Sequence, residues 1–259
     1  MRAWLPKEHG AYGQVAFPLV AAFGVAGMST AGALLSVAVI AGFLAHEPAA
    51  IVLGQRGARV KRELVTPAWT WLAFCLAIGM AAGLAAAFRL DPAARWSLAV
   101  PAIPASVLII AMVNGREKSW FGEAAAALAF AGICVPIALA AGASTSVGLA
   151  IAIPFALLFT TTTLAVRVVI LRVRGGGDLR ATAATRRATF IVSVVATALI
   201  GAFTVAGWLP GPVLLASAPG LLTAAIVAAR PPAPMKLRTL GWSLVAVSTL
   251  TTVIVTATL

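Results

Sequence analysis

Long apolar stretches follow one another along the whole chain, with short polar breaks between them. A helix that crosses the hydrocarbon core of a membrane needs roughly 20 mostly apolar residues. Because backbone groups in lipid must be paired within their own segment, stretches of this length are predicted to be helices and not strands. Nine of them predict helices near residues 12–28, 32–54, 68–88, 97–113, 123–142, 147–171, 188–208, 211–229 and 240–258.

The breaks between these stretches contain residues that disfavour helix. Asp91-Pro92 is typical of a turn, and three consecutive glycines at residues 175–177 are costly to hold in a helix. Prolines 231, 232 and 234 are expected to end the eighth helix. The sequence therefore predicts one all-α transmembrane domain over residues 1–259, in which residues 1–11 form an N-terminal segment before the first helix.

The composition supports a membrane protein. Hydrophobic residues make up 61% of the chain, charged residues only 10%, and the mean hydropathy is +1.03. Soluble domains carry about 25% charged residues. A soluble domain, a disordered chain and a secreted disulfide scaffold are therefore excluded.

The charged residues are distributed unevenly between the two ends of the predicted helices. Seventeen of the 19 Lys and Arg residues fall on the side that holds the N-terminus, and only Arg89 and Arg95 fall on the other. Cytoplasmic loops of membrane proteins carry an excess of Lys and Arg. We therefore expect a cytoplasmic N-terminus, an outside C-terminus and a multi-pass location in the cytoplasmic (inner) membrane.

The scarce acidic residues and both histidines indicate where any chemistry would lie. Six of the seven acids share the predicted cytoplasmic side with His9 and His46. In the second stretch, His46 and Glu47 precede Pro48, which can kink a helix and open a polar site. His46 and Glu47 are the candidate catalytic residues. The alternative is that Glu47 only pairs with a basic residue of a neighbouring helix.

Three further polar segments could contact a ligand. The N-terminal one is either a solvated tail or a segment folded over the bundle. The second, around residues 114–123, is either a short charged connection or part of a site, and a helix dipole alone would favour Glu123 at a helix start. Arg167 lies about one turn inside the sixth stretch and should pair with Glu47 or a ligand anion. The candidate substrate-binding residues are Lys7, Glu8, His9, Asn114, Arg116, Glu117, Glu123 and Arg167.

Short motifs suggest two family resemblances. The N-terminal run Pro6-Lys7-Glu8-His9-Gly10-Ala11 and the chain length resemble the uncharacterised YwiC-like membrane proteins. More distantly, nine helices with polar loops after the second and sixth resemble the UbiA superfamily of intramembrane prenyltransferases. Phe121-Gly122-Glu123 and Pro18 are similar to features of that superfamily. The resemblance implies a UbiA-like bundle, and prenyl transfer as the class of any enzymatic activity.

The chain departs from the UbiA pattern in its acidic residues. That superfamily places carboxylates at i and i+4 on its second and sixth helices to hold Mg²⁺ against a diphosphate, whereas no two acids here are four residues apart. Two interpretations stay open. Arg116, Arg167 and the loop bases could bind an anionic head group. Alternatively, a divalent transition metal could be held by members of the set Glu8, His9, His46, Glu47 and Glu123.

Together these features predict a membrane protein with a cytoplasm-facing polar pocket. The expected ligand is an isoprenoid, a quinone-like molecule or another anionic lipid-soluble compound, and no nucleic-acid partner is expected. If the protein is an enzyme, it is a divergent prenyltransferase without the Asp-rich motifs. The alternative function is non-catalytic, as a transporter or a partner of a respiratory complex.

Overall fold

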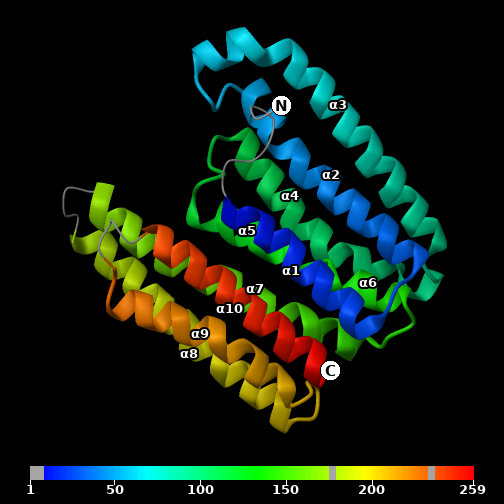
Figure 1. The fold of residues 1–259 in the computed structure, drawn as a ribbon, viewed down its shortest axis with the longest axis vertical. Coiled ribbons are helices and arrows are strands. Elements are labelled where there is room, and N and C mark those ends of the chain that lie inside the picture. The colour runs from blue at the N-terminus through cyan, green and yellow to red at the C-terminus, as the bar shows by residue number, and fades with distance from the viewer. Residues whose placement is uncertain (1–8, 175–178, 233–236) are drawn as a thin grey trace.

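The computed structural model describes residues 9–174, 179–232 and 237–259, without the side chains of residues 9, 172–174, 179 and 237. These residues fold almost entirely into helices (Figure 1). The elements are α1 (His9–Ala26), α2 (Thr30–Val52), α3 (Ala58–Arg89), the 3-10 helix η1 (Pro92–Leu98), α4 (Ala99–Val113), α5 (Trp120–Gly132), α6 (Cys134–Ala140), α7 (Thr145–Arg174), α8 (Leu179–Val205), α9 (Pro212–Ala229) and α10 (Leu237–Thr258).

Among the described residues, these elements confirm the predicted all-α membrane bundle. Eight helical segments are long and apolar enough to cross a membrane, and α1 supplies a shorter apolar helix at residues 10–26. η1 and α4 together form the fourth span, and α5 and α6 form the fifth. The described part of the chain contains no strand. The chain is therefore an integral membrane protein built as a multi-pass helical bundle.

Three boundaries differ from the predicted ones for identifiable reasons. Helix α3 begins at Ala58, ten residues before the predicted start at residue 68, and its first turns carry an Arg59–Glu63 pair at the favourable i, i+4 spacing. Helix α8 likewise begins at Leu179 within a basic segment. The fifth span is interrupted at Ile133, because Pro136 cannot donate a backbone hydrogen bond to Gly132.

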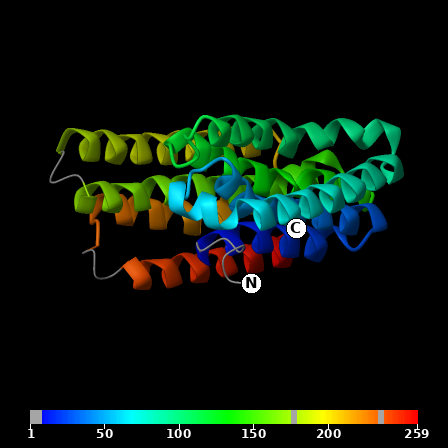
Figure 2. The same ribbon diagram turned by 90° about the horizontal axis from the view of Figure 1, so that it is seen from above.

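Successive helices run up and down, so their ends gather in two groups. Figure 1 shows α2, α4, α7 and α9 ending at the upper left, where α3, α5, α8 and α10 begin. We call this the basic end of the bundle, because it carries most of the Lys and Arg residues. Helix α3 packs along α2, and α1 and α10 lie side by side in both views (Figures 1 and 2).

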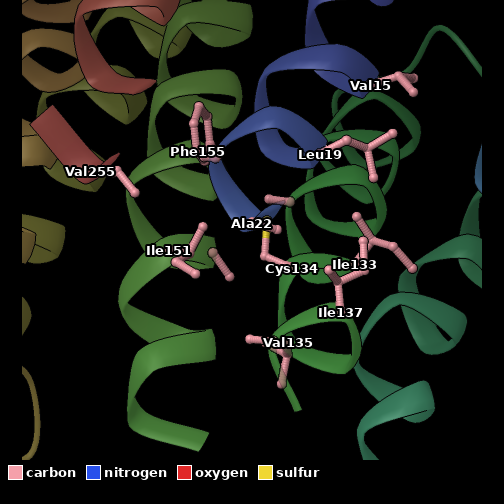
Figure 3. Packing of buried hydrophobic residues seen from close by; sticks show 14 of the residues in the cluster. Val15, Leu19, Ala22, Ile133, Cys134, Val135, Ile137, Ile151, Phe155 and Val255 are labelled. Carbon is pink, nitrogen blue, oxygen red and sulfur yellow. The ribbon is translucent and has the colours of Figure 1, made fainter. Parts of the chain in front are cut away.

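The main core lies where α1, α6 and α7 meet. Figure 3 shows Leu19 of α1, Ile137 of α6 and Phe155 of α7 as members of this buried cluster, with Val255 of α10 at the edge of the view. Cys134 is fully buried in this core, and its Sγ lies 3.4 Å from the Pro18 carbonyl oxygen. This packing fixes α1 and α7, two of the helices that border the cavity described below.

Candidate functional site

A tight turn between α2 and α3 folds basic side chains back toward the end of α2. The turn Gly54-Gln55-Arg56-Gly57 has positive φ angles at both glycines, +80° and +95°, which glycine adopts without steric penalty. Arg56 is thereby brought back to Glu47, nine residues earlier in the chain. Gln55 Nε2 donates to the carbonyl oxygen of Met112 near the end of α4.

Four side chains form what we call the ion-pair cluster: His46, Glu47, Arg56 and Glu117. Arg56 binds Glu47 through two hydrogen bonds, Nε to Oε1 at 2.9 Å and Nη2 to Oε2 at 2.7 Å. Its Nη1 donates to Glu117 Oε1 at 3.2 Å. On the other side, His46 Nε2 lies 3.1 Å from Glu117 Oε2. One guanidinium thus joins two carboxylates, Glu47 and Glu117, and the second lies 61 residues after Arg56 in the sequence.

The ion-pair cluster is largely shielded from solvent. The side chains of Glu47 and Glu117 are only 5% and 8% exposed, so each carboxylate depends on its basic partners for compensation. The contact with His46, helped by Arg56, lowers the pKa of Glu117 although burial opposes this shift. The hydrogen bond to Glu47 raises the pKa of Arg56, which therefore remains a cation at any physiological pH.

The segment that carries Glu117 is the α4–α5 loop, residues 114–119. Ser119 ends the loop, and its hydroxyl oxygen accepts a hydrogen bond from the backbone N–H of Gly122, capping α5. A Cβ atom at Gly122 would lie 2.5 Å from the carbonyl oxygen of Glu117. The loop therefore packs directly against the first turn of α5, and only glycine leaves room for this approach.

A large cavity lies on the other side of this loop, between α1, α7 and α10. Its volume is about 1210 Å³. Arg167 of α7 and Arg238 of α10 line its basic end, whereas Phe17, Leu158 and Phe159 line it deeper in the bundle. Leu158 and Arg167 are nine residues apart on α7, which corresponds to about 14 Å along the helix axis. The α1/α7/α10 cavity therefore has a charged end and an apolar end.

Arg167 connects the charged end of the cavity to the α4–α5 loop. Its Nη1 donates to Glu123 Oε2 at 3.1 Å and to the backbone carbonyl oxygen of Lys118 at 3.0 Å. Lys118 and Glu123 also line the cavity. Trp242, which lines it from α10, is 65% exposed, so the cavity reaches the surface of the described bundle at this helix.

The structure divides the predicted site residues between these two places. The ion-pair cluster contains His46, Glu47 and Glu117, and the cavity contains Glu123 and Arg167. Asn114 and Arg116 are exposed on the loop between them. Lys7, Glu8 and the side chain of His9 lie outside the described residues.

Two specific expectations need correction. Of the two partners expected for Arg167, Glu47 is wrong: the carboxylate that Arg167 contacts is Glu123, because α5 packs against α7. Its pairing with a ligand anion stays a prediction. The alternative for Glu47 was a basic partner on a neighbouring helix. Its partner is instead Arg56, which lies in the turn directly after α2, the helix that carries Glu47. Sequence spacing could not reveal either pair, because both depend on how the chain folds back.

The described residues do not support the metal interpretation. Within residues 9–174, 179–232 and 237–259, no three His, Cys, Asp or Glu side chains are grouped to hold a metal ion. Of the candidates, His46 and Glu47 belong to the ion-pair cluster, where Arg56 occupies both oxygens of Glu47. Glu123 is paired with Arg167 in the cavity.

Sequence reasoning missed the central roles of Arg56, Gln55 and Arg238. Arg56 was grouped with the other bases that follow the predicted polar site at His46 and Glu47, and no partner was assigned to it. The two glycines that flank Gln55-Arg56 were the available signal, since glycines three residues apart are typical of a tight turn. No comparable signal exists for Arg238, because its place in the cavity depends on how α10 packs.

Comparison with known proteins gives one match. The sequence model of the YwiC-like protein family matches residues 5–139, which cover α1 to α5 and most of α6. All four members of the ion-pair cluster fall within this range, whereas α7 and α10 lie beyond it. No curated protein and no solved structure matches the chain. The charged end of the cavity thus combines Lys118 and Glu123 from the matched half with Arg167 and Arg238 from the other half.

Proposed function

This chain belongs to the YwiC-like family, and we propose that its α1/α7/α10 cavity binds a lipid-soluble ligand with an anionic head group. The observation that carries this proposal is the polarity of the cavity. Basic side chains stand at its charged end, and aromatic and aliphatic side chains line its apolar end. An amphipathic molecule would match both ends at once.

The charged end offers donors suited to an anion. A guanidinium has five N–H donors in a planar fork that fits carboxylate and phosphate oxygens. The two described hydrogen bonds of Arg167 both use Nη1, and they hold the side chain in place at the cavity. Arg238 lines the same cavity from α10. A head group between these residues would be bound from two helices.

The apolar end is suited to a long hydrocarbon or ring system. Phe17, Leu158 and Phe159 supply aromatic and aliphatic surface. Pockets for drug-sized ligands measure about 300–1,000 Å³, so a cavity of about 1210 Å³ has room for a larger molecule. Because Trp242 is both exposed and part of the cavity lining, such a molecule would enter from the membrane beside it. An isoprenoid or quinone-like compound is the ligand class that we favour.

We propose binding rather than prenyl transfer. Among the residues that the structure describes, the acids near the basic end are Glu47, Glu63, Glu117 and Glu123, and each lies within 3.2 Å of an Arg side chain. Carboxylates neutralised in this way are poor ligands for Mg²⁺, whose charge the diphosphate mechanism requires. A transporter would be expected to have polar groups near the membrane midplane, whereas the described charges here gather near one end.

The experiment compares two probes that differ only in the head group, farnesyl monophosphate and farnesol. Equilibrium binding to purified protein in a neutral detergent should favour the monophosphate. The substitution Arg167→Gln should weaken monophosphate binding about 10-fold to 100-fold, because a charge-assisted hydrogen bond is lost. Farnesol binding should change less than about twofold, since the alcohol carries no charge to pair with the guanidinium.

The matched control is Arg95→Gln, which removes an exposed arginine from η1. This variant should bind both probes as the wild type does. Equal affinity of the wild-type protein for the two probes would overturn the proposed function. Unchanged monophosphate binding by the Arg167→Gln variant would do the same.

A further inference from the structure

The ion-pair cluster lies outside the cavity, although it is the most extensive charged contact among the described residues. We propose that this cluster positions the α4–α5 loop, so that Lys118 and its carbonyl oxygen are held at the charged end of the cavity. In this proposal, which rests on the proposed ligand site, Arg56 and Glu117 are positioning residues that never touch the ligand.

The first step of the argument is the adjacency of Glu117 and Lys118. Glu117 is held on one side of the loop by Arg56 and His46, at 3.2 and 3.1 Å. The next residue, Lys118, lines the cavity and accepts a hydrogen bond from Arg167 through its carbonyl oxygen. One peptide unit therefore separates the buried Glu117 from Lys118 at the ligand site. A shift in the backbone at Glu117 must also move Lys118.

The second step is the rigidity of the anchor itself. Arg56 is oriented by two hydrogen bonds to Glu47, a 4% exposed residue within α2, and two-point contacts of this kind fix the plane of a guanidinium. Gln55 holds the end of α4 through the Met112 carbonyl oxygen. The position of α2 is thereby transmitted to both the start and the middle of the α4–α5 loop.

The third step is the far side of the loop, which is equally constrained. The Ser119 hydroxyl donates to the Arg116 carbonyl oxygen at 2.6 Å and caps α5. Gly122 allows the loop backbone to approach α5 so closely that a Cβ atom would not fit. With anchors at α2, α4 and α5, the loop has one backbone path past the cavity.

Burial of the charges favours a positioning role over a purely stabilising one. Replacing a buried ion pair with apolar side chains of similar volume is often neutral or stabilising for a protein. Two carboxylates that are 5% and 8% exposed are thus an inefficient way to gain stability. Directional hydrogen bonds, in contrast, determine where the loop lies.

The test removes both carboxylates and the guanidinium of the cluster at once, so that neither a carboxylate nor a guanidinium is left buried without its partner. The variant is Glu47→Gln/Arg56→Met/Glu117→Gln. Farnesyl monophosphate binding should weaken about threefold to thirtyfold, and farnesol binding should change less than about twofold. Amide hydrogen exchange within residues 114–119 should accelerate about tenfold or more, while exchange in the core of α7 stays unchanged. The conservative variant Arg56→Lys should be intermediate in both measurements.

The matched control is Arg59→Gln/Glu63→Gln, which removes an exposed Arg–Glu pair whose side chains are 88% and 58% exposed. This control should leave probe binding and loop exchange unchanged. If the triple variant exchanges faster throughout the bundle, or loses both probes equally, the cluster only stabilises the fold and the proposal is overturned. The proposal would also be overturned if amide hydrogen exchange in residues 114–119 of the triple variant were as slow as in the wild type.

The two proposals fail in distinguishable ways. If the wild-type protein does not prefer the monophosphate, the proposed function fails. The exchange measurement, made without any ligand, would still show whether the cluster holds the loop. If the preference exists but persists unchanged in the triple variant, the ligand site stands and the positioning role is overturned.

Discussion

At Arg56 a single guanidinium compensates two buried carboxylates, and the two are not equivalent. Glu47 receives two hydrogen bonds from Arg56, whereas Glu117 receives one and has His46 as its second partner. The charge state of Glu117 therefore depends on two basic groups from different positions. This makes Glu117 the member of the cluster whose contribution is easiest to isolate by changing pH.

The first prediction concerns the pH dependence of stability. Because the pKa of Glu117 is lowered in the folded protein, its charged form stabilises the fold. This stabilisation is complete above the unfolded pKa of about 4.3 and is lost as pH falls through the lowered folded value. The difference in Tm between the wild type and the Glu117→Gln variant should therefore shrink as pH falls below about 5.

Thermal unfolding in a detergent that is stable to acid would measure this difference. The variant Glu63→Gln is the control, because its side chain is exposed and its removal should give no such pH-dependent difference. The prediction would be contradicted if the Tm of the wild type exceeded that of the Glu117→Gln variant by the same amount far below pH 4.

Individual residues show where sequence reasoning succeeded and where it stopped. Glu47 could be singled out, because a carboxylate within a span is costly and rarely without a partner. Its partner Arg56 could not, since the pairing depends on the turn angles at Gly54 and Gly57. Arg167 was correctly expected to seek a carboxylate, but the choice of Glu123 required knowing that α5 packs against α7.

At the scale of elements, the α4–α5 loop is the piece on which both proposals depend. We predict that Gly122→Ala displaces it, because the new Cβ would lie 2.5 Å from the Glu117 carbonyl oxygen and 3.0 Å from that of Arg116. The expected loss of stability is about 1–3 kcal/mol, typical of an overpacked site. Chemical unfolding in mixed micelles and hydrogen exchange of residues 114–119 would measure the two effects.

The control for this prediction is Gly42→Ala in α2, where an added Cβ meets nothing within 4 Å. That change should leave loop exchange unaltered and slightly favour the helix. If Gly122→Ala leaves both stability and loop exchange at wild-type values, the close packing of the loop against α5 is wrong.

Apolar length was enough to predict the spans but not their ends. The nine stretches all correspond to helices or helix pairs, because about twenty apolar residues must be helical in lipid. The start of α3 was missed, because its first turns carry Arg59, Lys61 and Arg62 and are not apolar. With 32 residues α3 is about 48 Å long, so it must project beyond the roughly 30 Å hydrocarbon core.

At the scale of the whole molecule, the distribution of charge predicts the orientation in the membrane. Seventeen of 19 Lys and Arg residues belong to the end that carries the N-terminal segment. We infer that this basic end faces the cytoplasm and that the C-terminus lies outside the cytoplasmic membrane. A C-terminal reporter that is active only in the cytoplasm should therefore be silent, and one active only outside should give a signal.

A fusion of the same two reporters after residue 115, in the α4–α5 loop, is the internal control and should give the opposite pattern. Strong cytoplasmic activity of the C-terminal fusion would contradict the odd number of spans if the fusion after residue 115 is also active in the cytoplasm. It would contradict the orientation if that fusion is silent there, and the charged end of the cavity would then lie at the opposite face of the membrane.

The described residues that were expected to form one polar pocket lie in two places. The polar residues do gather at one end, as the alternating charges predicted, but they form two groups on opposite sides of one loop. Sequence could assign His46, Glu117, Glu123 and Arg167 to the same end, because helix ends alternate. It could not separate the ion-pair cluster from the cavity, because that depends on helix packing across the bundle.

The burial of Cys134 in the core has a practical consequence for work on this protein. Cys134 is fully buried, and Cys75, the other cysteine of the chain, is only 3% exposed. Water-soluble maleimides react with solvent-accessible thiolates, and neither native thiol meets that requirement. The two native cysteines should therefore not react during thiol labelling. A cysteine introduced at one chosen surface position can then carry a spin label or fluorophore without prior replacement of Cys75 and Cys134.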